Sequence, residues 1–198
     1  GPVGAVYVAS APLLVGGPPD GQCSDCPSLP GVYRVEGPGQ APALVAQAQG
    51  LAYPKNLTFD NKSNLYVTDL MGGSIWRATP DGDMQLWLQD PLLMGNGQTL
   101  FDIPAGANGI AHRARKLYVS VTDTGSIVVV PIRGDGMPGR PRALVTDLPA
   151  LDGIALNARG DIYASAILEN GLILIDRHGR RVREIASGFC SPSGLAFG

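Results

Sequence analysis

An internal repeat constrains the fold of this chain more than any other feature of its sequence. Four segments align; they are YPKNLTFDNKSNLYVTD from Tyr53, GANGIAHRARKLYVSVTD from Gly106, ALDGIALNARGDIYAS from Ala150 and SPSGLAFG from Ser191. The aligned polar residues are Asn56, Asn108, Asp152 and Ser193, with separations of 52 (108 − 56), 44 (152 − 108) and 41 (193 − 152). A period in the forties is typical of a four-stranded propeller blade.

Each repeat contains the same succession of short β-rich runs. After the aligned segment and its second strand (NLYVTD, KLYVSVTD or DIYASA) comes a third strand: GSIWRAT, GSIVVVPI or GLILIDR. A polar hairpin leads to a fourth strand: MQLWLQD, PRALVTD or RVREIAS. Such runs, separated by Gly, Asn and Asp turns, indicate antiparallel strands, and no segment has a clear helical period. The sequence predicts an all-β fold, a β-propeller of four-stranded antiparallel blades.

The repeat divides the chain into the pieces of a single propeller domain. These pieces are 1–50, 51–105, 106–149, 150–190 and 191–198. The first lacks a first strand, because GAVYVAS, PGVYRVE and APALVAQ correspond to the second, third and fourth strands, whereas the last is a first strand alone. Two arrangements are open: a closed ring of about four blades, completed by the last strand, or part of a six-bladed propeller.

Charge and hydropathy argue against two classes of partner. The chain has 15 Lys and Arg against 17 Asp and Glu, scattered along 198 residues, so we expect no nucleic-acid surface. The one basic cluster, RHGRRVRE (177–184), lies between two strand-like runs and is interpreted as a solvated hairpin. No apolar run approaches the roughly 20 residues that span a bilayer, so we expect no membrane partner.

Two long loops lie outside the repeat. Residues 11–30 contain Cys23 and Cys26 in a C-x-x-C motif, and zinc would need about two more ligands than this pair supplies. We therefore expect a local disulfide, which favours an extracellular or periplasmic location. Residues 90–105 join two blades and are rich in apolar side chains. Loops of this length are often functional, although their apolar residues can also simply cover the core.

The aligned polar residues are the candidate functional site. First strands line the channel of a propeller and begin at one mouth, so Asn56, Asn108 and Asp152 are expected to converge there. One carboxylate with amide oxygens suits a hard divalent cation, calcium above all. Asn or Asp before Gly is also ordinary turn chemistry. Asp152 in particular needs a partner, since an unpaired buried acid costs several kcal/mol.

The repeats resemble a known family of six-bladed propellers over most of residues 31–198. The segments KNLTFDNKSNLYVTD, ANGIAHRARKLYVSVTD and LDGIALNARGDIYAS are similar to the gluconolactonase, regucalcin and luciferin-regenerating-enzyme family, and share strand patterns with NHL repeats. The resemblance implies a divalent cation, usually calcium, held by a Glu, an Asn and an Asp. It implies Asn108 and Asp152 as ligands, Asn56 as an auxiliary or substrate-side ligand, and Asp152 as the general base for lactone hydrolysis.

One departure from the family weakens the expected metal site. The family's Glu has no counterpart in residues 1–4, and Glu36 lies in the third strand of its unit. With one carboxylate, calcium should bind weakly, near the millimolar end of its range. The leading hypothesis is a metal-dependent hydrolase of small-molecule lactones or related esters. The alternatives are a non-catalytic propeller that binds a peptide, a sugar or a protein partner, and an inactive fragment.

Overall fold

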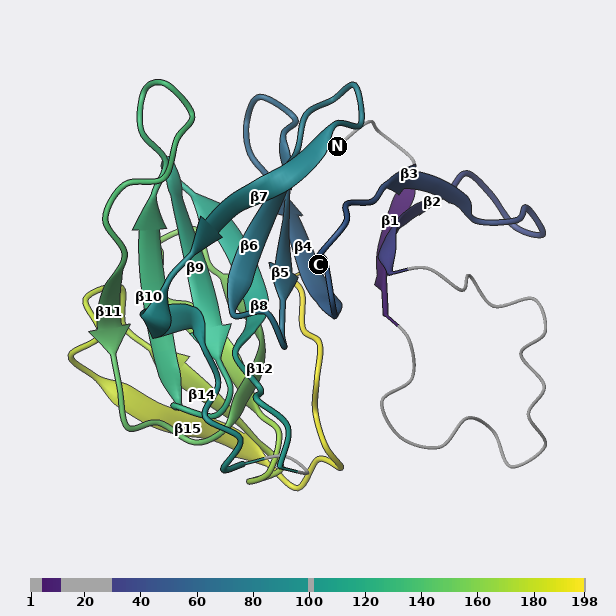
Figure 1. Ribbon diagram of the computed structural model, residues 1–198. Helices are drawn as coiled ribbons and strands as arrows, with labels where there is room; N and C mark the ends of the chain where they lie inside the picture. Colours follow the sequence, from purple (N-terminus) through teal and green to yellow (C-terminus); the bar gives the residue numbers. More distant parts are fainter. Residues whose placement is uncertain (1–4, 12–29, 100–101, 198) are drawn as a thin grey trace.

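The computed structural model describes residues 5–11, 30–99 and 102–197, and these form four antiparallel sheets arranged side by side (Figure 1). The first sheet has three strands: β1 (Val6–Ser10), β2 (Gly31–Val35) and β3 (Ala43–Ala46). The second has four: β4 (Pro54–Phe59), β5 (Leu65–Asp69), β6 (Ser74–Ala78) and β7 (Met84–Gln89). Cys23 and Cys26 lie outside the described residues.

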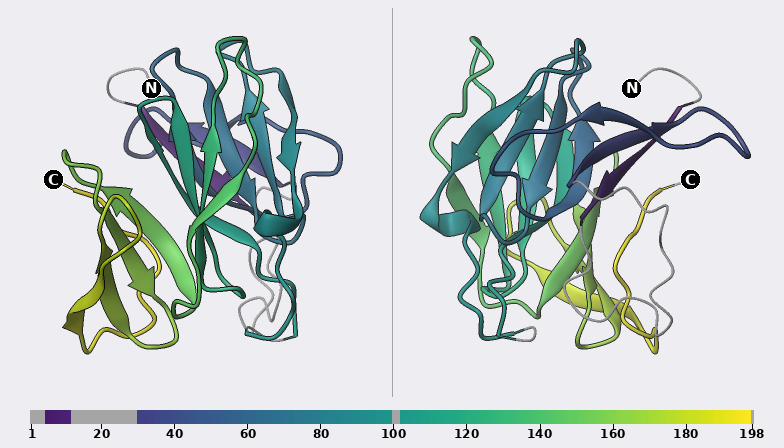
Figure 2. Two further views of the ribbon diagram at one scale, coloured as in Figure 1. Left: turned by 90° about the vertical axis from the view of Figure 1, so that its left-hand side faces the viewer. Right: turned by 45° about the vertical axis from the view of Figure 1, so that its right-hand side comes forward.

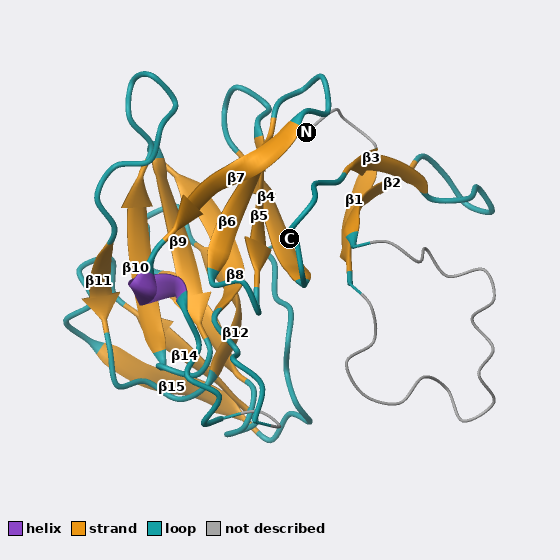
Figure 3. Ribbon diagram, viewed as in Figure 1, coloured by secondary structure: helices purple, strands orange, loops and turns teal. Residues whose placement is uncertain are grey.

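The two remaining sheets also have four strands each. The third consists of β8 (Ala107–Arg113), β9 (Lys116–Val121), β10 (Ser126–Pro131) and β11 (Arg142–Val145). The fourth consists of β12 (Leu151–Leu156), β13 (Ile162–Ala166), β14 (Gly171–Ile175) and β15 (Val182–Ser187). Figure 3 shows one short 3-10 helix, Pro91–Leu93, among these strands. No helix in the described part of the chain is long and apolar enough to span a membrane. The prediction of an all-β fold with four-stranded blades is confirmed.

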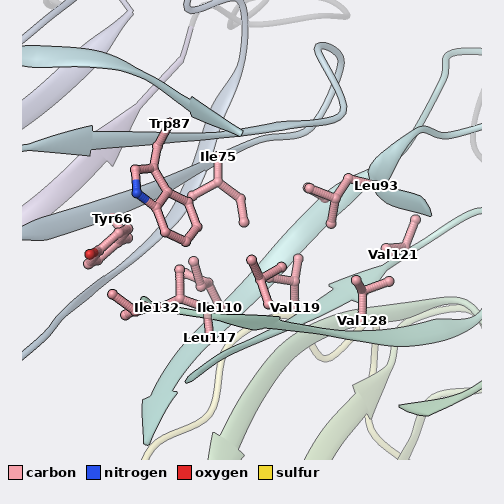
Figure 4. Packing of buried hydrophobic residues seen from close by; sticks show 12 residues of the cluster. Tyr66, Ile75, Trp87, Leu93, Ile110, Leu117, Val119, Val121, Val128 and Ile132 are labelled. Atoms are coloured by element: carbon pink, nitrogen blue, oxygen red, sulfur yellow. The ribbon is translucent and has the colours of Figure 1, made fainter. Parts of the chain in front are cut away.

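Apolar side chains between neighbouring sheets hold the blades together. Successive residues of a strand point to opposite faces, so a middle strand such as β5, which is buried throughout, packs on both of its neighbours. Three clusters of buried side chains lie at the three interfaces. In the middle cluster, shown in Figure 4, Tyr66, Ile75 and Trp87 pack on the β8–β11 blade. Each buried aliphatic side chain contributes roughly 1.5–3 kcal/mol, so these interfaces stabilise the stack of blades.

The blades form an open arc in the described residues (Figure 2). The inner strand β8 contacts both of the other inner strands, β4 and β12. β1 contacts β4 in the way that β5 contacts β8, so β1 occupies the place of a second strand in its blade. The last segment, 191–197, runs along β12, where Gly153 N donates to Ser193 O at 2.7 Å. Among the described residues no pairing joins this segment to β1, whose Val6 and Val8 are exposed. The fold is therefore a partial propeller, and the described strands do not form the closed four-blade ring.

Candidate active site at the channel mouth

Each inner strand is distorted at the aligned polar residue. The pairing register shifts between Pro54 and Leu57 in β4, and equivalent shifts occur in β8 and β12. In each case the inner strand advances by one residue more than its partner, which defines a β-bulge. Bulges re-aim side chains and are common next to active sites. Asn56, Asn108 and Asp152 thus lie in the same irregular backbone at the start of three successive inner strands.

Hydroxyl groups fix the bulges of β8 and β12, and the 191–197 segment, to the preceding blade. A Ser or Thr on each second strand donates to the backbone carbonyl of the aligned residue in the next blade. The donor and acceptor residues are Thr68 and Asn108 (2.5 Å), Ser120 and Asp152 (2.5 Å), and Ser165 and Ser193 (3.1 Å). Ser120 Oγ also accepts from Gly109 N, at 2.8 Å, so one hydroxyl joins two bulges. These bonds hold the backbone of Asn108 and Asp152 in place.

Glycine after the aligned residue allows this close approach. A Cβ on Gly109 would lie 2.4 Å from Asp152 O and 2.8 Å from Ile154 N, both of them backbone atoms. A Cβ on Gly153 would lie 2.3 Å from Ser193 O. The dipeptides Asn108-Gly109 and Asp152-Gly153 are therefore needed for contact between blades as well as for the local turn.

Asp152 has an ion-pair partner two blades away. Its side chain is buried, and Lys55 Nζ of β4 lies 3.6 Å from its Oδ2. Burial raises the pKa of Asp152, while Lys55 and a hydrogen bond from Asn108 act to lower it, and the net shift is upward. Desolvation is the larger effect because the carboxylate is enclosed and the Lys55 side chain is 32% exposed. The acid in an apolar stretch is thus balanced by an ammonium group across the channel mouth.

Asn108 presents a buried oxygen that has no hydrogen-bond partner. Its Nδ2 donates to Thr122 Oγ1 at 2.9 Å, and that hydroxyl in turn donates to Leu151 O at 2.7 Å. Because the hydroxyl proton is already used, Thr122 can only accept from Asn108, which fixes the orientation of the amide. Oδ1 of Asn108 is left without a partner, which costs about 1–3 kcal/mol for a buried polar atom. Such an atom is a suitable ligand for a cation or a polar substrate.

Asn56 behaves differently from the other two aligned residues. Its Oδ1 accepts from the backbone N of Leu57 at 2.8 Å, which is local turn chemistry. In the described chain it makes no hydrogen bond to Asn108 or Asp152, so its role as an auxiliary ligand stays a prediction. Its neighbour Lys55, which the sequence reasoning missed, reaches Asp152 instead. The signal available in the sequence was that Lys55 directly precedes Asn56, one of the aligned polar residues.

The donor set fits a divalent cation, although weakly. No group of three or more His, Cys, Asp or Glu that could hold a metal occurs among residues 5–11, 30–99 and 102–197. Glu36 forms an ion pair with Arg34. The oxygens on offer are the Asp152 carboxylate and Asn108 Oδ1, which are hard donors of the kind calcium prefers. The Lys55 ammonium competes for the same carboxylate.

Two aspartates outside the site, each at the end of a V-T-D run, cap turns. Asp69 accepts from the backbone N–H groups of Ala52, Tyr53 and Gly72. Asp123 Oδ2 accepts from three N–H groups of the 90–105 loop, which belong to Asn96, Gly97 and Ala105. Asp123 therefore pins this long loop to the β8–β11 blade.

Solved structures share this fold at low sequence identity. A gluconolactonase candidate from structural genomics has a TM-score of 0.68 and 19% identity, covering 85% of this chain and 60% of that chain. A gluconolactonase from Xanthomonas campestris has a TM-score of 0.65 and 22% identity, covering 84% and 58%. Regucalcin, a calcium-binding protein from Agrobacterium tumefaciens, has a TM-score of 0.63 and 16% identity, covering 83% and 56%. No protein-family model and no curated protein matches the chain.

These similarities define the fold as a gluconolactonase- and regucalcin-like propeller. The chain spans about 60% of the length of the structures it matches. At these identities the likeness is one of fold, and a propeller supports many unrelated activities. We therefore infer function from Asn108, Asp152 and Lys55 themselves.

Proposed function

We propose that the channel mouth hydrolyses small lactones or related esters, with Asp152 as the general base. The observation that carries the proposal is the buried Asp152 carboxylate with its raised pKa, whose hydrogen-bond partner Asn108 keeps a buried Oδ1 without a partner. The fold shared with gluconolactonases supports the same class of substrate.

The residues have distinct chemical roles in this proposal. A raised pKa makes the Asp152 carboxylate a better proton acceptor, so it can take a proton from the water that attacks the ester carbonyl. Lys55 keeps the carboxylate ionised in its buried position. Asp152 and Asn108 Oδ1 would hold a divalent cation, most simply calcium, whose Lewis acidity polarises a carbonyl oxygen. The bridge from Ser120 Oγ to Asp152 O fixes the distance between the two bulges.

A non-catalytic binding propeller is the second candidate function, and the Lys55–Asp152 ion pair favours it. An ammonium group 3.6 Å from the carboxylate already satisfies the charge that a cation would otherwise balance. The mouth would then offer an ion pair and an amide to a polar partner such as a sugar or a peptide. Either function is compatible with an extracellular or periplasmic location, which we retain as part of the proposal.

Thermal unfolding with calcium and with chelator, beside hydrolysis of a sugar δ-lactone, tests the proposal. We expect calcium to raise the Tm of the wild type by mass action and Asp152→Ala to abolish both this shift and hydrolysis. Asp135→Asn, at an exposed acid paired with Arg133, is the matched control and should retain both. Full hydrolysis by Asp152→Ala would refute the role of base. Full wild-type hydrolysis in excess chelator would refute the metal, and absence of hydrolysis in every condition would favour the binding propeller.

A further inference from the structure

A second feature lies at the opposite end of β12 from Asp152. It is a cleft of about 250 Å³ between the β8–β11 blade and the hairpins that close the β12–β15 blade. We call it the cationic cleft; it is lined by Arg113, Lys116, Tyr118, Arg142, Leu144, Arg159, Gly160, Arg177 and His178. Five of these side chains carry a permanent positive charge, and no carboxylate is among the lining residues.

The repeat provides an internal comparison for this cleft. The equivalent cleft between the β4–β7 and β8–β11 blades has a volume of about 360 Å³ and also contains several basic side chains. There, however, the carboxylates of Asp60 and Asp135 are part of the lining. Asp161, beside the cationic cleft, forms an ion pair with Arg159 at 3.6 Å and accepts from the backbone N of Arg177 at 3.3 Å, but it is not among the lining residues. The excess of positive charge is thus specific to the cationic cleft, in a chain whose net charge is −2.

The walls of the cationic cleft are held in place by contacts between blades. Arg113 reaches across and donates to Ala158 O at 2.6 Å and to Asn157 O at 3.4 Å. It packs over Gly160, where a Cβ would lie 3.1 Å from its Nε. On the other side, a Cβ on Gly179 would lie 2.5 Å from Leu144 O. The cleft is therefore a built feature of the interface and not a chance meeting of surface side chains.

Two of the remaining cations are free to bind a ligand. The side chains of Lys116 and Arg142 form no hydrogen bond or ion pair in the described part of the chain. Lys116 also lies directly opposite Arg113 in the β8–β9 pairing, and like charges in that position destabilise a sheet. An oxyanion between them would remove this repulsion and use the free N–H donors, since Arg and Lys side chains bind phosphate-like groups well.

We propose that the cationic cleft binds a phosphate or sulfate group, with Lys116 and Arg142 as its main ligands and Arg113 and Arg177 beside them. The oxyanion would come either from the free ion or from a monoester. This site is independent of the proposed hydrolase, because the whole of β12 separates it from Asp152.

Calorimetric titration with phosphate, sulfate and phenyl phosphate, and Tm values against chloride at equal ionic strength, test this proposal. We expect saturable binding to the wild type, and the double variant Lys116→Gln/Arg142→Gln should weaken it by about tenfold or more. Because neither side chain has a partner, this variant should fold normally. Lys62→Gln/Arg133→Gln removes the same charge from the neighbouring cleft and should bind as the wild type does.

The outcomes separate specific binding from simple screening of charge. Stabilisation by chloride equal to that by phosphate, or full binding by Lys116→Gln/Arg142→Gln, would overturn the proposal. Tighter binding of phenyl phosphate than of the free ions would identify a monoester as the ligand, whereas equal binding would identify the free ion. Failure here leaves hydrolysis at Asp152 unaffected, because the two sites share no residue.

Discussion

The bulges of β8 and β12 share one backbone and carry different chemistry. In both, a hydroxyl of the preceding blade donates to the carbonyl of the aligned residue, and glycine follows it. Asn108 directs its amide to Thr122, whereas Asp152 pairs with Lys55 across the mouth. The repeat therefore fixes the backbone position of each aligned residue. The identity of its side chain then decides what the position does.

Of the substitutions in the two bulges, those of the glycines are expected to reduce stability the most. In Gly109→Ala the new Cβ meets Asp152 O and Ile154 N, backbone atoms of a strand held inside a blade. We expect a loss of about 1–3 kcal/mol of unfolding free energy, as for overpacking, with a lower Tm. Gly153→Ala has a similarly short contact, to Ser193 O in the 191–197 segment, which pairs with no second strand among the described residues. Since that segment can shift, the loss should be smaller.

Denaturant unfolding of both variants measures this difference. Equal losses in Gly109→Ala and Gly153→Ala would show that the 191–197 segment is held as firmly as β12. Such a result would contradict the expectation that the single 191–197 segment shifts more easily than β12, which is paired within a blade.

Much of the fold could be predicted from the sequence because the repeat reports it locally. Hydrophobic runs and turn residues mark each strand within a few residues, and the second strands NLYVTD, KLYVSVTD and DIYASA coincide with β5, β9 and β13. The capping role of Asp69 follows from its recurrence at the end of a strand. The convergence of Asn108 and Asp152 was also predictable, because equivalent points of successive blades meet at the channel.

Contacts between side chains of different blades could not be predicted from the repeat. Lys55 reaches Asp152 from two blades away, which depends on the curvature of the arc and not on any local pattern. The 177–184 hairpin is mostly exposed, in line with its interpretation as a solvated hairpin, but the sequence did not show that Arg177 lines the cationic cleft with Arg113 and Lys116 of the preceding blade. Both cases require the relative placement of blades, which a repeat length alone does not give.

Asp152 is charged and Asn108 is not, and this difference predicts a pH-dependent effect on stability that is intermediate in size. Burial raises the pKa of Asp152 above its ordinary value of 3.8, so protonation of Asp152 favours the folded state. This contribution is complete below the unfolded pKa and is lost as the pH rises through the folded pKa. Asp152→Asn does not titrate and makes the β12 bulge resemble that of β8. Without metal, it should be more stable than the wild type at pH 7, by about 0.5–2 kcal/mol.

Urea unfolding between pH 4 and pH 8 checks this expectation. The advantage of Asp152→Asn should shrink as the pH falls toward 4, and it should disappear only below the unfolded pKa of 3.8, where Asp152 is protonated in both states. A constant difference across this range would mean that packing, and not the charge of Asp152, distinguishes the two bulges. Asn56→Ala serves as the control, since the Asn56 side chain is neutral and, among the described residues, bonds only to the backbone N of Leu57.

The smallest effect on stability is expected at Lys55, the residue that makes the two bulges unequal. Lys55→Met keeps most of the side chain and removes the ammonium; because the pair is 3.6 Å long and Lys55 is 32% exposed, unfolding free energy at pH 7 should fall by about 1 kcal/mol or less. The pKa of Asp152 should rise further, because its main favourable charge is gone. If Asp152 is the base, the rise of hydrolysis rate with pH should therefore move to higher pH. Calcium should also stabilise Lys55→Met more than the wild type, since the competing cation has been removed. An unchanged pH profile together with an unchanged calcium response would mean that Lys55 lies beside Asp152 without controlling it.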